Sequence, residues 1–378
     1  MKARVILWDM DGKGKKWIDD NIRTDRLDIV QIIPVYEKNV QLINDDIDLL
    51  LIATHEIDLG LEKMLEYVGF HSDRYVYIYH LGSWYEKFSL AMFLLKDEPG
   101  AMGRLLLWRR EGDLKDYCTC RADGLTFVAS VKDCAIMPKM FMDGQTWSAD
   151  EMKLFYELAH EYYAISDDKP GYFLDLGANI GTTCIYFRRK LDENVKIIAF
   201  EPDVRNNRLL HINMQLKCLT EEARIEAYGL SNRSEKKTLH YDESNPGGTS
   251  LVKNPGGLTT EVSLISLDDY FAAGKLDAGK IKYIWIDTEG FEPLVIGGAQ
   301  KILRHNNIPL YMEFNPYLWE KQGLFDDMLT ILQNSGYTDF IMIQEYMEGN
   351  KSVFPLCALQ SLRTAGAWYL RDIFLIKN

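Results

Sequence analysis

The chain alternates between short apolar runs and longer stretches in which apolar residues recur at helical spacing. The runs are bounded by polar, Gly or Pro residues, as is typical of strands buried on both faces of a parallel sheet. They cover residues 4–8, 27–33, 48–54, 75–79, 172–176, 195–200, 223–228, 260–267, 281–286, 309–314, 338–343 and 369–376. Strands that alternate with helices in this way predict an α/β protein.

Residues 1–90 hold the first of these runs, with helix-like stretches after Trp17 and over 59–69. They predict a small parallel sheet, and we interpret the region as a Rossmann-like accessory domain. Residues 91–142 are rich in aromatic side chains and are expected to form a connecting or substrate region. The third region, 143–378, carries the longest series of strands.

The first loop of the N-terminal region allows two sharper interpretations. Asp9-Met-Asp11-Gly12 resembles the opening motif of haloacid dehalogenase-like phosphatases, in which the first carboxylate is the nucleophile, but Lys13 departs from that motif. Gly12-Lys-Gly14 resembles a degraded dinucleotide loop, yet the two carboxylates would repel a pyrophosphate. We therefore favour a domain without catalysis.

Local signals place two helices of the third region. Ser148 and Glu151 have the spacing of a capping box, which predicts a helix that begins after Ser148 and keeps helical spacing as far as Tyr162. A single helix is expected over 317–334. These helices fit between the strands of an open α/β sheet.

Composition excludes several classes of protein. The net charge of -13 over 378 residues disfavours a nucleic-acid partner. No apolar run is long enough to span a bilayer, and Asp9 and Asp11 cut the first run short, so we expect neither membrane insertion nor a signal peptide. Six cysteines are scattered, and Cys118-Thr-Cys120 has the wrong spacing for a zinc knuckle. We expect reduced thiols in a cytoplasmic protein.

The stretch from Gly171 to Gly181 organises the third region. A buried strand that contains Asp175 runs into a turn bracketed by Gly177 and Gly181, and a helix-like segment follows. Strand, glycine turn and helix is the arrangement that brings backbone N–H groups to a ligand. The next strand ends at Glu201, where a carboxylate can accept hydrogen bonds from ribose hydroxyls.

Three motifs occur in order, each at the end of a predicted strand. They are Asp-Leu-Gly-Ala-Asn-Ile-Gly at 175–181, Phe-Glu-Pro-Asp at 200–203, and Ile-Asp-Thr-Glu-Gly-Phe-Glu at 286–292 with Gly-Gly-Ala at 297–299 behind it. Together they resemble the FkbM family of S-adenosylmethionine-dependent methyltransferases. The resemblance covers 143–378 and implies a class I methyltransferase fold, which is a seven-stranded, mostly parallel sheet whose last strand is antiparallel.

The resemblance also assigns the cofactor-binding residues, which are Asp175, Gly177, Asn179, Gly181, Glu201, Leu230, Ser231 and Asp287. It places the backbone at Gly177 and Asn179 against the methionine part of S-adenosylmethionine. It implies that Asp175 orients the ammonium group of the cofactor through water and that Glu201 accepts hydrogen bonds from the ribose hydroxyls. Leu230 and Ser231 are expected beside the adenine.

Methyl transfer to a hydroxyl is an in-line displacement that gains from alignment and from a general base. Asp287 is the first candidate to touch both cofactor and acceptor, and Glu289 and Glu313 complete the candidate catalytic set. His240 is an alternative base. These carboxylates could bind Mg²⁺, which would lower the pKa of an acceptor hydroxyl. Glu289 and Glu292 could equally be helix N-terminal carboxylates favoured by the helix dipole, which is our preferred explanation for Glu292, so no residue is assigned as a metal ligand.

The predicted function is therefore S-adenosylmethionine-dependent methylation, with a hydroxyl of a sugar, glycan precursor or small polar metabolite as the acceptor. Two alternatives stay open: a non-catalytic cofactor-binding or scaffold protein, and a bifunctional chain whose N-terminal domain acts on a sugar nucleotide or phosphate ester. The expected partner is a small-molecule or saccharide acceptor, and the question of a homo-oligomer stays open.

Overall fold

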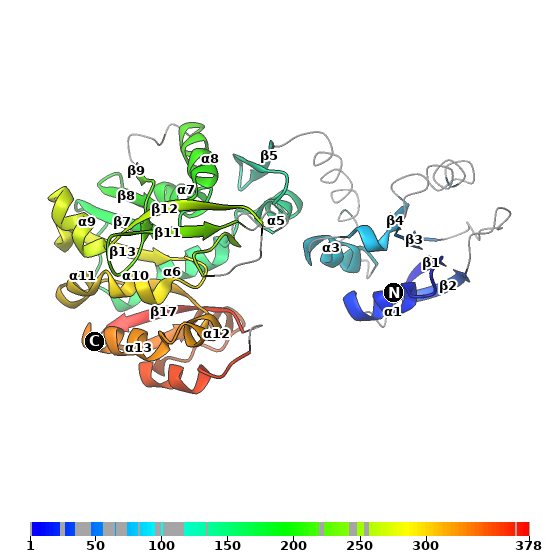
Figure 1. The fold of residues 1–378 in the computed structure, drawn as a ribbon. Helices are drawn as coiled ribbons and strands as arrows, with labels where there is room; N and C mark the ends of the chain where they lie inside the picture. The colour runs from blue at the N-terminus through cyan, green and yellow to red at the C-terminus, as the bar shows by residue number, and fades with distance from the viewer. Residues whose placement is uncertain are drawn as a thin grey trace. The chain divides into compact units, whose positions relative to one another are not determined.

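The chain forms two compact units (Figure 1), called here unit 1, Met1–Cys120 with Ser130–Gly144, and unit 2, Arg121–Ala129 with Gln145–Asn378. The computed structural model describes residues 2–22, 27–34, 47–55, 65, 74–81, 84–94, 100, 117–133, 135–217, 219, 223–241, 248–252, 257–366 and 369–377. The three-part division expected from the sequence, into 1–90, 91–142 and 143–378, stays a prediction.

Unit 1 is built on a four-stranded sheet with the order β2-β1-β3-β4. Every neighbouring pair is parallel, and the strands are β1 (Ala3–Asp9), β2 (Leu27–Ile33), β3 (Leu49–Ala53) and β4 (Tyr75–Tyr77). The helices described here are α1 (Gly14–Asn21), η1 (Ile78–His80), α3 (Trp84–Leu94) and α5 (Ile136–Asp143). The expected small parallel sheet is confirmed, whereas the helix expected over 59–69 lies outside the described residues except for Leu65.

Both faces of this sheet are buried. In β1, Val5 and Leu7 belong to one hydrophobic core, and Ile6 and Trp8 belong to a second. A strand covered on both sides has no solvent face to supply alternating polar residues. The continuous apolar runs in the sequence follow directly from this arrangement.

Unit 2 is built on an eight-stranded sheet with the order β16-β15-β17-β14-β13-β7-β8-β9. Its strands are β7 (Gly171–Leu176), β8 (Val195–Phe200), β9 (Ala223–Glu226), β13 (Ile281–Ile286), β14 (Leu310–Phe314), β15 (Tyr337–Met342), β16 (Phe354–Pro355) and β17 (Arg371–Lys377). As expected, the last strand, β17, is antiparallel to both of its neighbours. This is the class I methyltransferase arrangement with one strand added at the edge.

The added strand, β16, corrects the expected count of seven. It pairs only Phe354 and Pro355 with β15, where the rings of Phe340 and Phe354 stack with centroids 5.5 Å apart. A two-residue strand has no periodicity of its own, so the sequence pattern could not reveal it.

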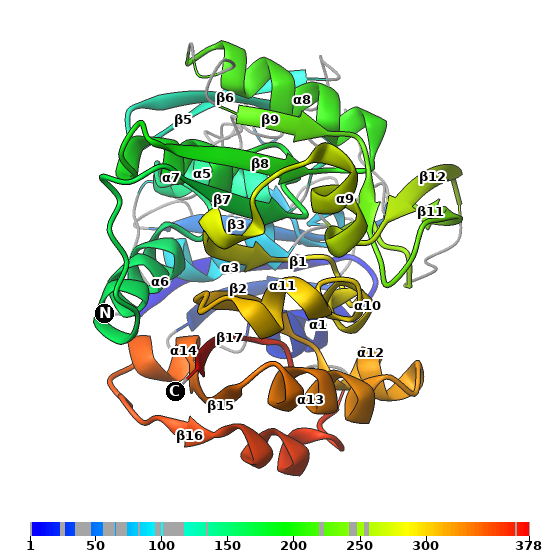
Figure 2. The same cartoon turned by 90° about the vertical axis from the view of Figure 1, so that its left-hand side faces the viewer.

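Helices cover both faces of the large sheet. One face packs against α9 (Leu267–Gly274), α10 (Glu292–Gly297), α11 (Gln300–His305) and α13 (Phe325–Asn334), of which α9 and α11 are on the near side in Figure 2. On the other face, Phe155 of α6 (Ala149–Tyr162) contacts the rings of Tyr283, Trp285, Tyr311 and Phe374 on the strands. The remaining helices are α7 (Thr182–Lys190), α8 (Val204–Gln215), α12 (Pro316–Lys321), α14 (Ile343–Met347), η4 (Ala278–Lys280) and η5 (Leu356–Leu362).

Two local predictions about helices were wrong. Ser148 does precede α6, but its φ of 53° is left-handed and its side chain does not cap the helix, so no capping box forms. The helix expected over 317–334 is instead two helices, α12 and α13. Gly323 separates them with a φ of 68°, a conformation that does not continue an α-helix.

The described residues also form two small sheets. The strands β10 (Gly229–Leu230), β12 (Thr259–Ile265) and β11 (Glu235–His240) form an arm in the order β10-β12-β11, and β5 (Tyr117–Ala122) pairs with β6 (Leu125–Ser130). Among the described residues, no helix is long and apolar enough to cross a membrane. The described cysteines, Cys118, Cys120, Cys184 and Cys357, are in the thiol form.

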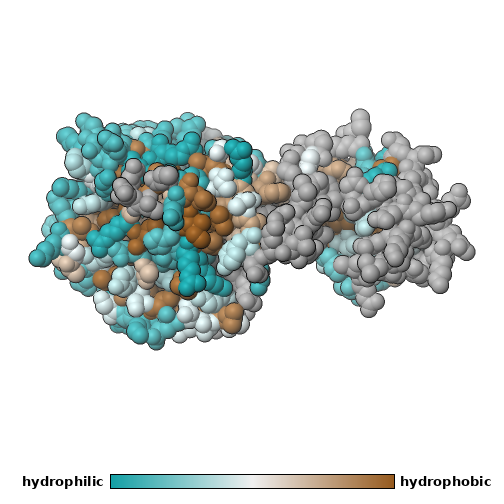
Figure 3. Space-filling view, turned by 90° about the horizontal axis from the view of Figure 1, so that it is seen from above, coloured by the Kyte–Doolittle hydropathy of each residue, from teal (hydrophilic) through white to brown (hydrophobic). Residues whose placement is uncertain are grey.

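The surface of unit 2 seen from above shows a patch of hydrophobic residues among hydrophilic ones (Figure 3). Helix α8 also exposes apolar side chains. Val204, Ile212 and Leu216, at the outer side of this helix, are 50%, 41% and 54% exposed. The opposite side of α8 buries Leu210 and Asn213. This helix is therefore apolar on more than its core-facing stripe.

Asn213 ties β6 to the body of unit 2. Its side chain accepts a hydrogen bond from the backbone N–H of Val128 (2.7 Å) and donates to the carbonyls of Val128 (3.0 Å) and Ile180 (2.9 Å). The residue is fully buried. It therefore fixes segment 121–129 to α8 and to the loop after β7.

We expect Asn213→Ala to lower the free energy of unfolding by about 2–3 kcal/mol, because buried backbone groups lose their partners. Urea unfolding of the full chain measures this. The matched control is Asn334→Ala in α13, an exposed position, which should change little. Equal stability of the two variants would contradict the bridging role of Asn213.

Candidate active site

A pocket of about 600 Å³, part of it open to solvent, lies in unit 2 at the carboxyl ends of β7, β8 and β13. Open α/β sheets bind ligands at this edge. The loop after β7 contributes Gly177 and Asn179, β8 leads into Glu201, and β13 leads into Asp287 and Glu289. Three adjacent parallel strands thus deliver the three sequence motifs to one place.

The turn after β7 is possible only because residue 177 is glycine. Gly177 has a φ of 100°, and a Cβ built there would lie 1.8 Å from the carbonyl oxygen of Asp287. The backbone N–H groups of Gly177 and Ala178 both donate to the carbonyl of Phe200, at 3.1 and 3.0 Å. The turn is therefore clamped between β8 and the residues after β13.

Glu201 is buried at the wall of the pocket and holds two backbone segments. Its carboxylate accepts hydrogen bonds from the N–H of Asn179 and from the N–H of Asp203, both at 2.8 Å. Burial raises the pKa of Glu201 to about 8, although both of these bonds oppose the shift. The carboxylate thus joins the turn after β7 to the start of α8.

Asp175 lies inside the sheet rather than at the pocket surface. It is fully buried and is not among the described residues that line the pocket. Its Oδ2 accepts a hydrogen bond from the thiol of Cys184 at 2.9 Å, and burial raises its pKa to about 7. Any contact with a ligand would pass through the turn or through water.

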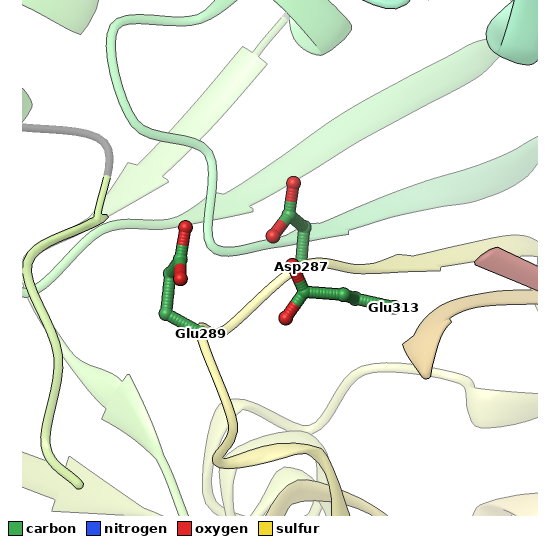
Figure 4. Close-up of side chains that lie close together, drawn as sticks. All are labelled: Asp287, Glu289 and Glu313. Atoms are coloured by element: carbon green, nitrogen blue, oxygen red, sulfur yellow. The ribbon is translucent and has the colours of Figure 1, made fainter. Parts of the chain in front are cut away.

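Three carboxylates gather where β13 and β14 end (Figure 4). Oxygen atoms of Asp287, Glu289 and Glu313, one from each side chain, lie within 4.8 Å of one another. Asp287 is exposed to the pocket, whereas Glu313 is 7% exposed. Desolvation and the charge of Glu289 raise the pKa of both Asp287 and Glu313 well above the usual range.

A fourth carboxylate, Glu292, shapes the loop that carries this cluster. It is fully buried and accepts hydrogen bonds from the N–H and hydroxyl of Thr288, the N–H of Gly290 and the indole N–H of Trp319, at 2.9 to 3.1 Å. The loop needs this support because Glu289 and Gly290 have φ values of 55° and 97°. Glu292 is therefore a structural residue, as the sequence suggested.

Residues 175–338 match a family model described as the methyltransferase FkbM domain. Methyltransferase sdnD of Sordaria araneosa is 27% identical over 194 residues, which cover 44% of this chain and 73% of that protein. Residues 175–338 are an FkbM methyltransferase domain. The resemblance seen in the sequence is confirmed over these residues, and the family they match is one of S-adenosylmethionine-dependent methyltransferases.

Solved structures of methyltransferases are similar at low sequence identity. The methyltransferase FkbM of Methylobacillus flagellatus is 12% identical with a TM-score of 0.37, over 99% of this chain and 90% of that one. A geranyl diphosphate methyltransferase in complex with S-adenosylmethionine is 9% identical with a TM-score of 0.32, over 60% of this chain and 84% of that one.

The FkbM domain brings only some of the expected residues to the pocket. Gly177, Asn179, Glu201, Leu230, Asp287 and Glu289 line it. Ser231 is fully buried and is not among the described lining residues, and its N–H donates to the carbonyl of Ile265. Gly181 caps α7 with a φ of 91°, and Glu313 reaches the carboxylate cluster from β14. His240 is not among the described residues of the lining.

Several lining residues of the FkbM domain were not expected from the sequence. Tyr228 follows β9 and is 40% exposed at the pocket, Thr249 and Leu251 come from the arm, and Phe291 follows the carboxylate loop. Tyr228 had a detectable signal, since it ends a predicted strand next to the expected adenine. Thr249 had none, because a bridge between His240 and Ser250 and a hydrogen bond from Ser250 to the carbonyl of Glu289 place it.

The buried carboxyl of Asp175 predicts a pH dependence of stability. The folded FkbM domain holds this proton up to about pH 7, whereas an unfolded Asp releases it near about 3.9. The stabilisation is therefore complete below the unfolded pKa and is lost as the pH rises toward 7. When the pH rises from about 5 to about 8, the free energy of unfolding of the native chain should therefore fall by about 2–3 kcal/mol more than that of Asp175→Asn.

Urea unfolding across that range, without cofactor, measures the difference. Asp327→Asn at an exposed position of α13 serves as the matched control and should follow the native chain. Parallel curves for the native chain and Asp175→Asn would contradict a protonated buried carboxyl.

Proposed function

We propose that this protein is an S-adenosylmethionine-dependent O-methyltransferase whose acceptor is a hydroxyl of a sugar, glycan precursor or other small polar metabolite. One observation carries the proposal: the glycine turn, Glu201 and the carboxylates Asp287 and Glu289 line the same pocket. A cofactor held on the turn and an acceptor held by the carboxylates would meet there. The match of 175–338 to the FkbM domain supports the choice of methyl donor.

In this proposal the cofactor lies along the ends of β7, β8 and β9. The backbone at Gly177 and Asn179 holds the methionine part, and Gly181 keeps the turn in shape. Glu201 accepts hydrogen bonds from the ribose, using lone pairs left beside its two backbone contacts. Leu230 packs against the adenine. Asp175 and Ser231 act from beneath, through the backbone or through water.

Bound S-adenosylmethionine supplies the methyl group as a sulfonium. Asp287 would orient the acceptor hydroxyl and take its proton as that oxygen gains the methyl group, with the carbon–sulfur bonding pair left on sulfur. Desolvation and neighbouring charge make this carboxylate more basic than an ordinary Asp, which suits a general base. Glu289 and Glu313 complete the acceptor side, and Mg²⁺ is the cation that three oxygen ligands would suit.

We further propose that residues 1–90 form an accessory domain without a reaction of its own. In unit 1, Asp9 accepts a hydrogen bond from the N–H of Gly14 at 2.7 Å, and Asp11 accepts one from the hydroxyl of Tyr79 at 2.8 Å. Both carboxylates thus have local structural partners, which supports this assignment over a phosphatase centre.

We expect Glu201→Ala to weaken S-adenosylmethionine binding by about 1.5–3 kcal/mol, the range for hydrogen bonds to a charged group. The turn after β7 also loses a support, so Glu201→Gln, which keeps one acceptor oxygen, should lose less. Calorimetric titration of the full chain measures both, with the exposed Glu193→Ala as control. Native affinity in a folded Glu201→Ala protein would remove the ribose assignment.

Replacement of Asp287 by Asn should lower turnover on the order of 10²-fold or more and change cofactor affinity little. Asn keeps the size of the side chain but cannot take the proton. Single-turnover transfer, or slow hydrolysis of the cofactor where the acceptor is not in hand, gives the rate, and calorimetry gives the affinity. Asp327→Asn is the control. A rate equal to that of the native chain would move the active centre away from Asp287.

The same titration separates the enzyme from a scaffold that merely kept the fold. Binding of S-adenosylmethionine, followed by detection of S-adenosylhomocysteine after incubation with candidate acceptors, is the expected result. No binding at millimolar cofactor would favour the scaffold.

A further inference from the structure

The acidic cluster of Asp287, Glu289 and Glu313 is built from two neighbouring strands. β13 and β14 are parallel partners, with Ile286 opposite Met312, so the residues that follow or end them come together at one edge of the sheet. Oxygen atoms of all three side chains lie within 4.8 Å of one another. Like charges at this spacing repel unless a proton or a cation lies between them.

Glu313 gives a second and independent sign of a missing ligand. Its side chain is 7% exposed, and its Oε2 has no hydrogen-bond partner in the described part of the chain. In Figure 4 its carboxylate points toward Asp287 and Glu289 rather than away from them. A buried carboxylate oxygen without a partner is costly, so something is expected to fill the space it faces.

The neighbouring carboxylates do not fill it. Glu292 accepts hydrogen bonds from the loop 288–290 and from Trp319. Asp372, on β17 opposite Glu313, accepts a hydrogen bond from the side-chain amide of Gln344 at 2.5 Å. Both already have hydrogen-bond partners, so the buried carboxylate oxygen without a described partner belongs to the cluster itself.

We infer that Asp287, Glu289 and Glu313 bind one hard divalent cation, of the Mg²⁺ class, on the acceptor side of the pocket. This inference rests on the proposed methyl transfer. Ligands made only of carboxylate oxygen, without His or Cys, select such ions. Two oxygens bound to one Ca²⁺ ion can be about 5 Å apart, so the 4.8 Å limit of the cluster already fits that ion. For Mg²⁺, bound at about 2.1 Å, the limit is about 4.2 Å, so the side chains would have to close in slightly on binding.

The cation would act on the acceptor hydroxyl. Protein oxygens fill one side of its coordination shell, and the positions that face the pocket take water or the acceptor oxygen. Binding lowers the pKa of that hydroxyl. Asp287 uses one carboxylate oxygen as a ligand and the other to take the proton, while the acceptor oxygen forms its bond to the methyl carbon and the carbon–sulfur bond breaks toward sulfur.

Manganese titration of the full chain tests the site without any acceptor. The protein is first treated with chelator and desalted, and Mn²⁺ is then added while electron paramagnetic resonance reports the free ion. We expect one Mn²⁺ per chain, displaced by excess Mg²⁺, and at least ten-fold weaker binding in Glu313→Gln and in Asp287→Asn. The exposed controls Glu348→Gln and Asp327→Asn should bind as the native chain does.

Two variants are used so that the test still stands if one of them fails to fold. Glu313 is buried, so Glu313→Gln could fail to fold, and its far-ultraviolet circular dichroism and thermal melting are checked first. Asp287 faces the pocket, and Asp287→Asn keeps the side-chain volume. No bound Mn²⁺ at millimolar concentration, or native affinity in both folded variants, would overturn the site.

Cofactor titrations distinguish this failure from failure of the proposed function. S-adenosylmethionine binding is measured once with Mg²⁺ and once with chelator. Cofactor binding without any bound Mn²⁺ would sink the cation site and leave the methyltransferase proposal standing. Bound Mn²⁺ with no cofactor binding under either condition would do the reverse.

Discussion

The contact between Gly177 and the backbone of Asp287 is the constraint on which the pocket depends. The turn after β7 passes so close to the residues after β13 that a methyl group at position 177 would overlap the Asp287 carbonyl oxygen, 1.8 Å away. Hydrogen bonds from the same turn to Phe200 attach it to β8. These contacts hold the ends of β7, β8 and β13 together at one edge of the sheet, and side chains that follow them line the same pocket.

Buried carboxyl groups are the second constraint on this edge, and they are stabilised in different ways. Glu292 accepts hydrogen bonds from Thr288, Gly290 and Trp319, and Glu201 accepts two from the backbone. Asp175 has the Cys184 thiol and a pKa raised to about 7 by burial. Glu313 keeps a buried oxygen without a described partner. The groups already satisfied are structural, and the unsatisfied one indicates where a ligand belongs.

Local pattern predicted the strands well and the ends of helices poorly. Continuous apolar runs such as 281–286 identify strands because a sheet covered on both faces leaves no polar face to interrupt them. The spacing of Ser148 and Glu151 indicated a capping box, yet the chain enters α6 with Ser148 at a φ of 53°. The direction from which a chain enters a helix is set by packing against the rest of the unit, and sequence spacing carries no information about that direction.

By itself, the sequence determined the α/β class, the strand ends and the chemical identity of the motifs, because each depends on residues that are near one another along the chain. Tertiary structure decided which of those residues share a pocket. Asp175 and Glu201 both belong to the motifs, but only Glu201 lines the cavity. Alternate residues of a strand point to opposite faces, and Asp175 is buried with its side chain against Cys184 of α7. It also decided the partnership of Asp287 with Glu313, which are 26 positions apart in the sequence and meet only because β13 and β14 pair side by side.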